Sequence, residues 1–177
     1  MKDTKKLVMA ALFAALSCVA TMSIRIPTPG TGGYIHPGDA IVILSGVFLG
    51  PGYGALAAGI GSALSDLIGG YFVYVPITLV IKGAVAFVAG YAFRKLQQRG
   101  VNSYIAVAAG GIADIILVAG GYFLCEIPLY SATGAAASIP ANLIQGVSGL
   151  VIGLILFPIL SAIPDFKRMS QAGIAHK

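Results

Sequence analysis

Two ionisable side chains lie deep inside long apolar stretches of this sequence. Lys82 falls about seven residues into the apolar segment 75–93, and Asp114 about twelve residues from the C-terminal end of segment 103–126. Charged groups in such surroundings are costly, so they usually pair with one another, face a cavity or bind a ligand. Two interpretations stay open: a structural ion pair between Lys82 and Asp114, or a Lys82 that binds a ligand oxygen or anion while Asp114 holds its side chain.

Further polar side chains gather where apolar segments end. Glu126 closes segment 103–126, and Asn142 and Gln145 lie three residues apart at the start of segment 139–161, so they share one helix face. A carboxylate and two amides at adjoining helix ends suit a small ligand that forms hydrogen bonds. We predict ligand contacts for these three residues, whereas Asp66, at the end of segment 53–70, meets either ligand or water.

Aromatic side chains collect on the same side of the predicted segments: Tyr34, Tyr71, Phe72, Tyr74, Tyr122 and Tyr130. Tyrosines at a membrane interface commonly anchor helices at the headgroup level. A tyrosine can also stack on a flat heterocycle and offer a hydroxyl to it. We take Tyr34, Tyr74 and Tyr122 as candidates for this second role.

The stretch GGYIHPGDAIV, residues 33–43, concentrates turn and polar residues just before an apolar run. Asp39 directly precedes AIVIL and is predicted to be the N-cap of a helix. Pro37 and Gly38 fix the turn into that helix. His36 is then either a ligand contact or an exposed loop histidine, and Tyr34 and His36 would cover a ligand from a loop hinged at Gly32 and Gly33.

The elements that must position these residues are membrane helices. Of the 177 residues, 58% are hydrophobic and only 10% are charged, which excludes an ordinary soluble domain. The fold class is an all-α integral membrane protein, a single domain over residues 1–177 forming a compact bundle of six transmembrane helices. The predicted spans are 7–24, 39–49, 53–70, 75–93, 103–126 and 139–161, the last beginning near Ser138 and Pro140. Segment 39–49 is too short to cross a bilayer alone.

The basic residues predict the orientation. Nine of the eleven lie at the two termini and between the fourth and fifth spans, which an even number of crossings puts on one side: Lys2, Lys5, Lys6, Arg94, Lys95, Arg99, Lys167, Arg168 and Lys177. By the positive-inside rule that side is cytoplasmic, so both termini face the cytoplasm and the loop of residues 25–38 faces outside. The net charge of +5 is therefore a topology signal, and we expect no nucleic-acid partner.

No catalytic or metal-binding pattern is visible. The sequence lacks GxxxxGK[ST], HExxH and GxSxG motifs, so we expect neither an enzyme nor a metal site. A self-sufficient small channel or proton-coupled carrier that uses Lys82 and Asp114 remains the alternative function.

Several strings resemble the S components, the substrate-binding subunits of energy-coupling factor (ECF) vitamin transporters. They are AALFAALSCVA after a basic N-terminus, YIHPGDAIVILSGVFLGPGYGALAAGIGSALSDLIGGY and PITLVIKGAVAFVAG. The last two are similar to the branch for hydroxymethylpyrimidine and pyridoxine-type substrates. The resemblance implies a prokaryotic multi-pass cell-membrane subunit that captures a vitamin in its outer half, under the loop after the first span. The resemblance further implies that the subunit would topple to deliver the vitamin inward, driven by a transmembrane T component and two cytoplasmic ABC ATPases. ATP would be used by those partners, and no cofactor is expected in this chain.

The resemblance also assigns a partner surface and narrows the ligand. Ala10, Ala11, Ala14 and Ala15 form an AxxxA face that, in S components, meets the T component. Tyrosine faces, amides and carboxylates match a small hydroxylated aromatic nitrogen heterocycle, and Arg25 is the one basic residue predicted on the outer side. Riboflavin and folate therefore rank lower, while biotin, pantothenate, thiamine-type and queuosine-type substrates stay open.

Overall fold

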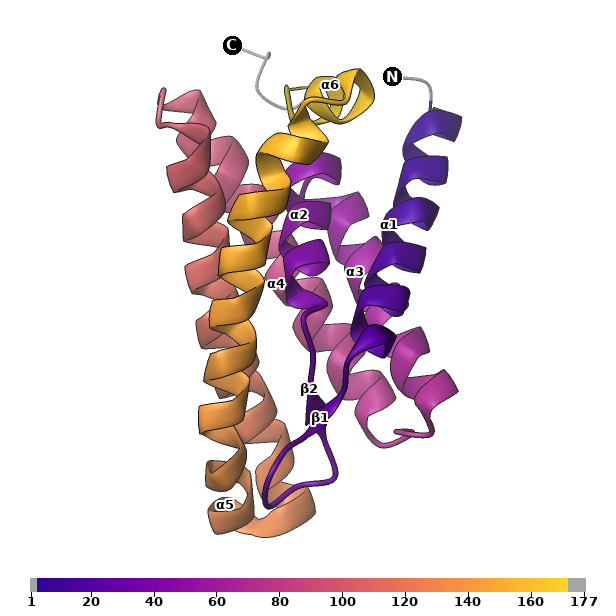
Figure 1. Cartoon of the computed structure of the whole chain (residues 1–177), viewed down its shortest axis with the longest axis vertical. Coiled ribbons are helices and arrows are strands. Elements are labelled where there is room, and N and C mark those ends of the chain that lie inside the picture. The colour runs from indigo at the N-terminus through magenta and orange to yellow at the C-terminus, as the bar shows by residue number, and fades with distance from the viewer. Residues whose placement is uncertain (1–2, 172–177) are drawn as a thin grey trace.

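The computed structural model describes residues 3–171, which form a bundle of helices with one small β-hairpin (Figure 1). The elements in chain order are α1 (Asp3–Ser23), β1 (Ile26–Pro27), β2 (Tyr34–Ile35), α2 (Asp39–Leu49), α3 (Pro51–Gly69), α4 (Tyr74–Gln98), α5 (Ser103–Ser161) and α6 (Pro164–Gln171). The all-helical prediction is confirmed, and the first four predicted spans correspond to α1 to α4.

Helix α5 consists of two antiparallel arms. Its 59 residues are interrupted at Ser131, whose φ of 77° and ψ of 162° are not helical, and the chain turns back there (Figure 1). The two arms contain the predicted fifth and sixth spans, but the predicted loop between them, residues 127–138, is wrong. The alanines at 135–137 favour helix over a loop, so the second arm is already helical at Ser138 and Pro140.

Helix α2 lies at the centre of the bundle. It packs against all five other helices, and nine of its eleven residues are buried. Close approach of neighbouring backbones depends on small residues: a Cβ at Gly46 would overlap the carbonyl oxygen of Ala86 on α4. This short helix is therefore enclosed by protein over its whole length.

The short helix α6 was not predicted from the sequence. It buries Phe166 and Met169 against the end of the bundle, where the Phe166 ring lies 5.7 Å from that of Phe13 and 5.3 Å from that of Phe48. Lys5 on α1 forms an exposed ion pair with Asp165.

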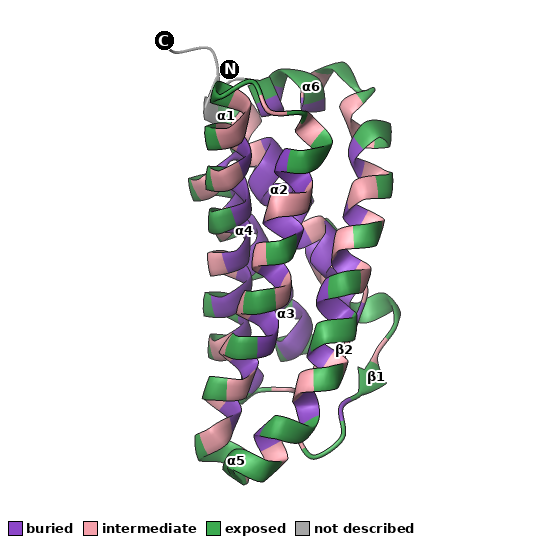
Figure 2. Cartoon of the chain, turned by 90° about the vertical axis from the view of Figure 1, so that its left-hand side faces the viewer, coloured by how far each residue is buried: buried purple, intermediate pink, exposed green. Residues whose placement is uncertain are grey.

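The surface of the bundle is far more apolar than that of a soluble protein, and charged groups are buried within it. Large apolar side chains such as Val80, Ile116 and Ile68 are more than 60% exposed, while Lys82, Asp39 and Asp114 are fully buried. Exposed positions follow the outward faces of the helices, and buried ones their inward faces (Figure 2). Within the described residues, three helices are long and apolar enough to cross a bilayer: Thr4–Ser23, Tyr74–Gln98 and Ser103–Ser161. An apolar surface, with the charged groups kept inside the bundle, is what a lipid environment requires.

The two ends of the bundle differ in character. The start of α1, the turn between α4 and α5, and α6 lie at one end, whereas the β-hairpin, the α3–α4 turn and the break at Ser131 lie at the other (Figure 1). The described basic residues other than Arg25 and Lys82 belong to the first end, as predicted, and Lys2 and Lys177 lie outside the described residues. Which end faces the cytoplasm stays a prediction.

Candidate functional site

The β-hairpin forms one wall of a cavity at its end of the bundle. Ile26 pairs with Ile35 and Pro27 with Tyr34, and the Thr28 amide donates to the Gly33 carbonyl over 3.1 Å. The loop between the strands lies close to α5, because a Cβ at Gly30, whose φ is 78°, would overlap Ala137 and meet the Gly134 carbonyl oxygen. The tip of the hairpin therefore packs against the second arm of α5.

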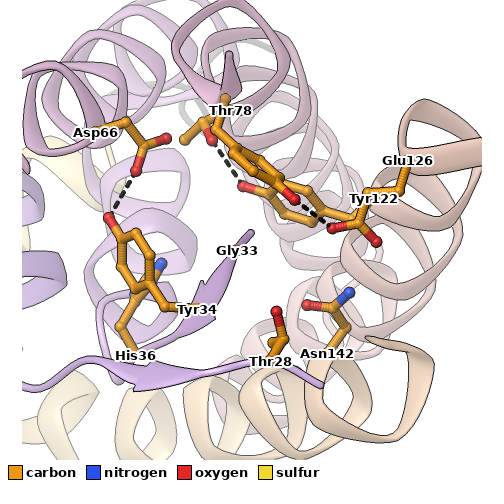
Figure 3. A pocket seen from close by; sticks show the side chains of 10 residues that line it. Thr28, Gly33, Tyr34, His36, Asp66, Thr78, Tyr122, Glu126 and Asn142 are labelled. Carbon is orange, nitrogen blue, oxygen red and sulfur yellow. Dashed lines mark hydrogen bonds between the residues drawn. The ribbon is translucent and has the colours of Figure 1, made fainter. Parts of the chain in front are cut away.

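The cavity is small in this structure, about 20 Å³, far below the roughly 300–1,000 Å³ that ligand pockets occupy, so a ligand requires the hairpin or the lining side chains to move apart. It is lined by the hairpin segment and by α3, α4 and both arms of α5 (Figure 3). The lining residues are Thr28, Gly33, Tyr34, His36, Asp66, Tyr74, Thr78, Tyr122, Glu126 and Asn142.

Glu126 organises one side of the cavity. Its Oε1 accepts a hydrogen bond from the Tyr74 hydroxyl over 2.9 Å, and its Oε2 accepts one from Ser138 over 2.5 Å. The Asn142 amide lies one turn beyond Ser138 and donates to its hydroxyl over 3.4 Å. The Glu126 carboxylate thus connects α4 with the two arms of α5.

Asp66 and Tyr34 form the opposite side. The Tyr34 hydroxyl donates to Oδ1 of Asp66 over 2.6 Å, and burial followed by this hydrogen bond raises the pKa of Tyr34 well above its usual value, so it remains a donor. Oδ2 of Asp66 is buried without a hydrogen-bond partner among the described residues. Between the two carboxylates, Thr78 and Tyr122 share a hydrogen bond of 2.9 Å (Figure 3). The cavity therefore offers a free carboxylate oxygen to a ligand that donates hydrogen bonds.

A buried ion pair lies next to this cavity, and it differs from the predicted one. Lys82 donates to Oδ1 of Asp39 over 2.5 Å, while both carboxylate oxygens of Asp114 lack hydrogen-bond partners in the described part of the chain. Of the two interpretations left open, the structural ion pair between Lys82 and Asp114 is therefore wrong. The Gln145 amide also donates to Asp39, over 2.8 Å, and its oxygen accepts the His36 backbone N–H over 3.0 Å. Gln145 thus connects the hairpin segment to the ion pair.

The predicted N-cap role of Asp39 is also wrong. Gly38 occupies the N-cap position of α2 without a side-chain cap, and Asp39 is the first residue of the helix. Its side chain is fully buried and turns towards Lys82 on α4. Pairing with a buried ammonium group stabilises the carboxylate more than capping would, because an unpaired charge in this interior is very costly.

His36 is buried and neutral. Burial lowers its pKa from 6.5 to about 3, against the opposing attraction of Asp39, and its Nδ1 accepts the Gly38 N–H over 3.0 Å.

Between pH 6.5 and 3 the unfolded chain binds a proton at His36 that the folded chain does not, so the free energy of unfolding should decrease as the pH falls through that range. We expect a slope approaching about 1.4 kcal/mol per pH unit from this group. Unfolding midpoints measured from pH 7.5 to 4.5 in detergent test this, and His36→Asn should flatten the slope; an equal slope in both proteins would contradict it.

Six of the eight predicted ligand-contact residues line the cavity: Tyr34, His36, Tyr74, Tyr122, Glu126 and Asn142. Lys82 and Gln145 do not line the cavity, and instead both donate hydrogen bonds to Asp39 beside it. Ligand contact itself stays a prediction for all eight. The sequence interpretation missed Thr28, Gly33 and Thr78; Thr78 lies four residues after Tyr74, and this helical spacing was the available signal.

The four predicted partner-contact alanines all line a second, apolar groove between α1 and α3. Ala11 and Ala15 are exposed, Ala14 is half-buried, and Ala10 is buried within the bundle. Ala14 packs so closely on α3 that a Cβ at Gly61 would overlap its carbonyl oxygen. The exposed part of this surface is therefore Ala11 and Ala15 together with larger apolar side chains such as Leu56.

Comparison with known proteins gives a consistent family. Residues 1–162 match the family model described as the ECF-type riboflavin transporter, S component. An uncharacterised protein from a gap 3′ region of Pyrococcus woesei is 37% identical over 135 residues, 76% of this chain and 87% of that protein. The thiamine precursor transporter HmpT of Lactococcus lactis subsp. cremoris is 28% identical over 160 residues, 90% of this chain and 89% of the transporter.

Two solved structures share the fold. An S component of a bacterial ECF transporter superposes with a TM-score of 0.67 at 18% identity, covering 91% of this chain and 98% of that one. The S component for biotin from an ECF-type ABC transporter gives a TM-score of 0.57 at 19% identity, covering 89% and 95%. At these identities the likeness concerns the fold alone.

Proposed function

Because this chain belongs to the S components of ECF transporters, multi-pass membrane proteins that are not enzymes, we propose that it captures a small vitamin precursor in the cavity under the β-hairpin. Hydroxymethylpyrimidine is the substrate we favour, with a pyridoxine-type compound second. The observation that carries this proposal is the pair of buried carboxylates, Asp66 and Glu126, in a cavity lined by tyrosines.

The chemistry of the lining favours a ligand with several N–H donors. Asp66 has a carboxylate oxygen without a partner among the described residues, and Glu126 faces the same space. An aminopyrimidine presents an amino group beside a ring nitrogen, and in its protonated form these two groups match both oxygens of a carboxylate. No lysine or arginine is among the lining residues, so an anionic vitamin would meet two carboxylates without a compensating cation.

One of the relatives supports the same choice. Although the matching family model is named for riboflavin, the 28% identity to a thiamine precursor transporter over 90% of this chain favours a pyrimidine.

We propose that delivery depends on partner subunits. The sequence has no GxxxxGK[ST] motif, so ATP hydrolysis must come from two partner ATPases, coupled through a T component. The basic end of the bundle would face the cytoplasm, with six crossings and the hairpin outside. Toppling would then carry the cavity inward.

The apolar groove between α1 and α3 is the proposed T-component surface, and it allows a specific prediction. Ala15→Trp should weaken assembly with the T component at least tenfold, because a large ring would fill the groove that a partner helix needs. Val8→Trp is the matched control, since Val8 is 61% exposed on the same helix but does not line the groove. Co-purification and vitamin binding measure the effect; equal loss of both in Ala15→Trp would indicate a packing defect instead.

The function is tested by transport in proteoliposomes. Uptake of labelled hydroxymethylpyrimidine should require the T component, both ATPases and ATP, while the isolated chain binds the compound without transporting it. A chain that transports unaided would contradict the proposal and support the alternative of a self-sufficient channel or proton-coupled carrier.

A further inference from the structure

Arg25, which directly precedes β1, packs against two tyrosines at the edge of the cavity. Its guanidinium carbon lies 4.9 Å from the ring centroid of Tyr34 and 5.5 Å from that of Tyr71. The two rings are themselves 4.5 Å apart, at an angle of 52°. A guanidinium group at these distances is attracted to the electron-rich faces of aromatic rings.

The same guanidinium group also attaches to α3. Nη2 of Arg25 donates to the Ser65 carbonyl oxygen over 3.0 Å, close to the C-terminal end of the helix, where a cation is favourable. Gly69 provides the space for this contact, because a Cβ at Gly69 would overlap the guanidinium group. Arg25 therefore joins the hairpin, Tyr71 and α3 at one point.

Tyr34 links this point to the cavity. It lies on β2, contacts Arg25 through its ring, and donates its hydroxyl to Asp66 within the lining. Arg25 itself is not among the lining residues. A change at Arg25 would thus reach a ligand only through the position of Tyr34 and the hairpin.

We propose that Arg25 is a positioning residue that anchors the hairpin to α3 and thereby sets how fast the bound vitamin leaves. This inference rests on the proposed function, because it takes the hairpin as the cover of the binding cavity. The anchor lies at the α3 side of the hairpin, so opening requires its release.

The first test needs no ligand. Hydrogen exchange of hairpin amides, such as Thr28 N–H, should be on the order of tenfold faster in Arg25→Ala and in Gly69→Ala than in the wild-type protein in detergent. The double variant, with both Arg25→Ala and Gly69→Ala, should exchange no faster than Arg25→Ala alone. Once the guanidinium group is absent, the methyl group added at Gly69 has nothing to displace. Gly120→Ala, whose Cβ would meet no atom within 4 Å, and Arg94→Ala, an arginine that donates to the Leu49 carbonyl elsewhere, should behave as wild type.

The second test uses labelled hydroxymethylpyrimidine. Arg25→Ala and Gly69→Ala should speed its dissociation about tenfold with little change in association rate, and Arg25→Lys, which keeps the charge but not the planar group, should fall between them and wild type. Wild-type exchange and dissociation in both single variants, or additive effects in the double variant, would refute the role of Arg25. Failure of the wild-type protein to bind any vitamin precursor would instead refute the proposed function, and with it the effect on dissociation.

Discussion

Glu126→Gln is expected to weaken vitamin binding by roughly 10- to 100-fold, corresponding to the about 1.5–3 kcal/mol that hydrogen bonds to charged groups contribute. Each carboxylate oxygen of Glu126 accepts a hydrogen bond from a hydroxyl group, one from Tyr74 and one from Ser138. A glutamine would turn an N–H donor towards one of these hydroxyls and would remove the negative charge that faces the ligand. Isothermal titration of the purified variant with hydroxymethylpyrimidine measures the loss.

Two controls make the result specific to the site. Asp165→Asn removes a carboxylate at the opposite end of the bundle, on α6, and should leave affinity unchanged. Ser138→Ala removes one of the two donors to Glu126 but keeps the carboxylate, so its loss should be smaller than that of Glu126→Gln. If Glu126→Gln folds normally and binds with wild-type affinity, Glu126 does not contact the ligand.

Lys82→Met is expected to destabilise the fold by about 3–5 kcal/mol, because it leaves the fully buried Asp39 carboxylate without its ammonium partner. Adding Asp39→Asn should recover most of that loss, since the remaining charge is removed while the new side-chain amide oxygen still accepts the Gln145 N–H. Unfolding of the detergent-solubilised protein in urea, compared among wild type, both single variants and the double variant, gives the coupling.

Asp114→Asn is the matched control for this experiment. The Asp114 carboxylate is buried but makes no hydrogen bond among the described residues, so its replacement by an amide of the same shape should cost no more than about 1 kcal/mol. A Lys82→Met protein as stable as wild type, yet devoid of unaided ion-dependent flux, would contradict the structural role and favour the carrier alternative.

The pattern of apolar segments predicted most of the helices. Segment 39–49 was predicted with the observed bounds of α2, because a run of apolar residues between a glycine–aspartate pair and a glycine–proline pair has few other options in a membrane bundle. The break of α5 could not be placed in this way. Proline and polar residues around 127–138 resemble a loop, but the alanines among them extend the helix, and the single non-helical residue within α5 is Ser131.

The buried polar contacts were harder to predict than the helices. Depth along a segment identified Lys82 as a residue that needs a partner, but it favoured Asp114, because Asp39 was predicted to cap a helix. Which carboxylate reaches Lys82 depends on how α2 and α4 are rotated about their axes. This rotation is set in the folded bundle by contacts such as that of Gly46 with α4. Glu126 and Asn142 were found because they end and begin apolar segments, whereas Thr28 lies in a loop without any such signal.

The central claim is that the cavity under the hairpin binds a small aminopyrimidine. Its most direct test is equilibrium binding of hydroxymethylpyrimidine, pyridoxine, riboflavin and biotin to the purified wild-type chain under identical conditions. We predict submicromolar to micromolar binding of hydroxymethylpyrimidine, at least about 100-fold tighter than riboflavin or biotin. Tight binding of riboflavin, or of the anionic biotin, with none of the pyrimidine would contradict the account.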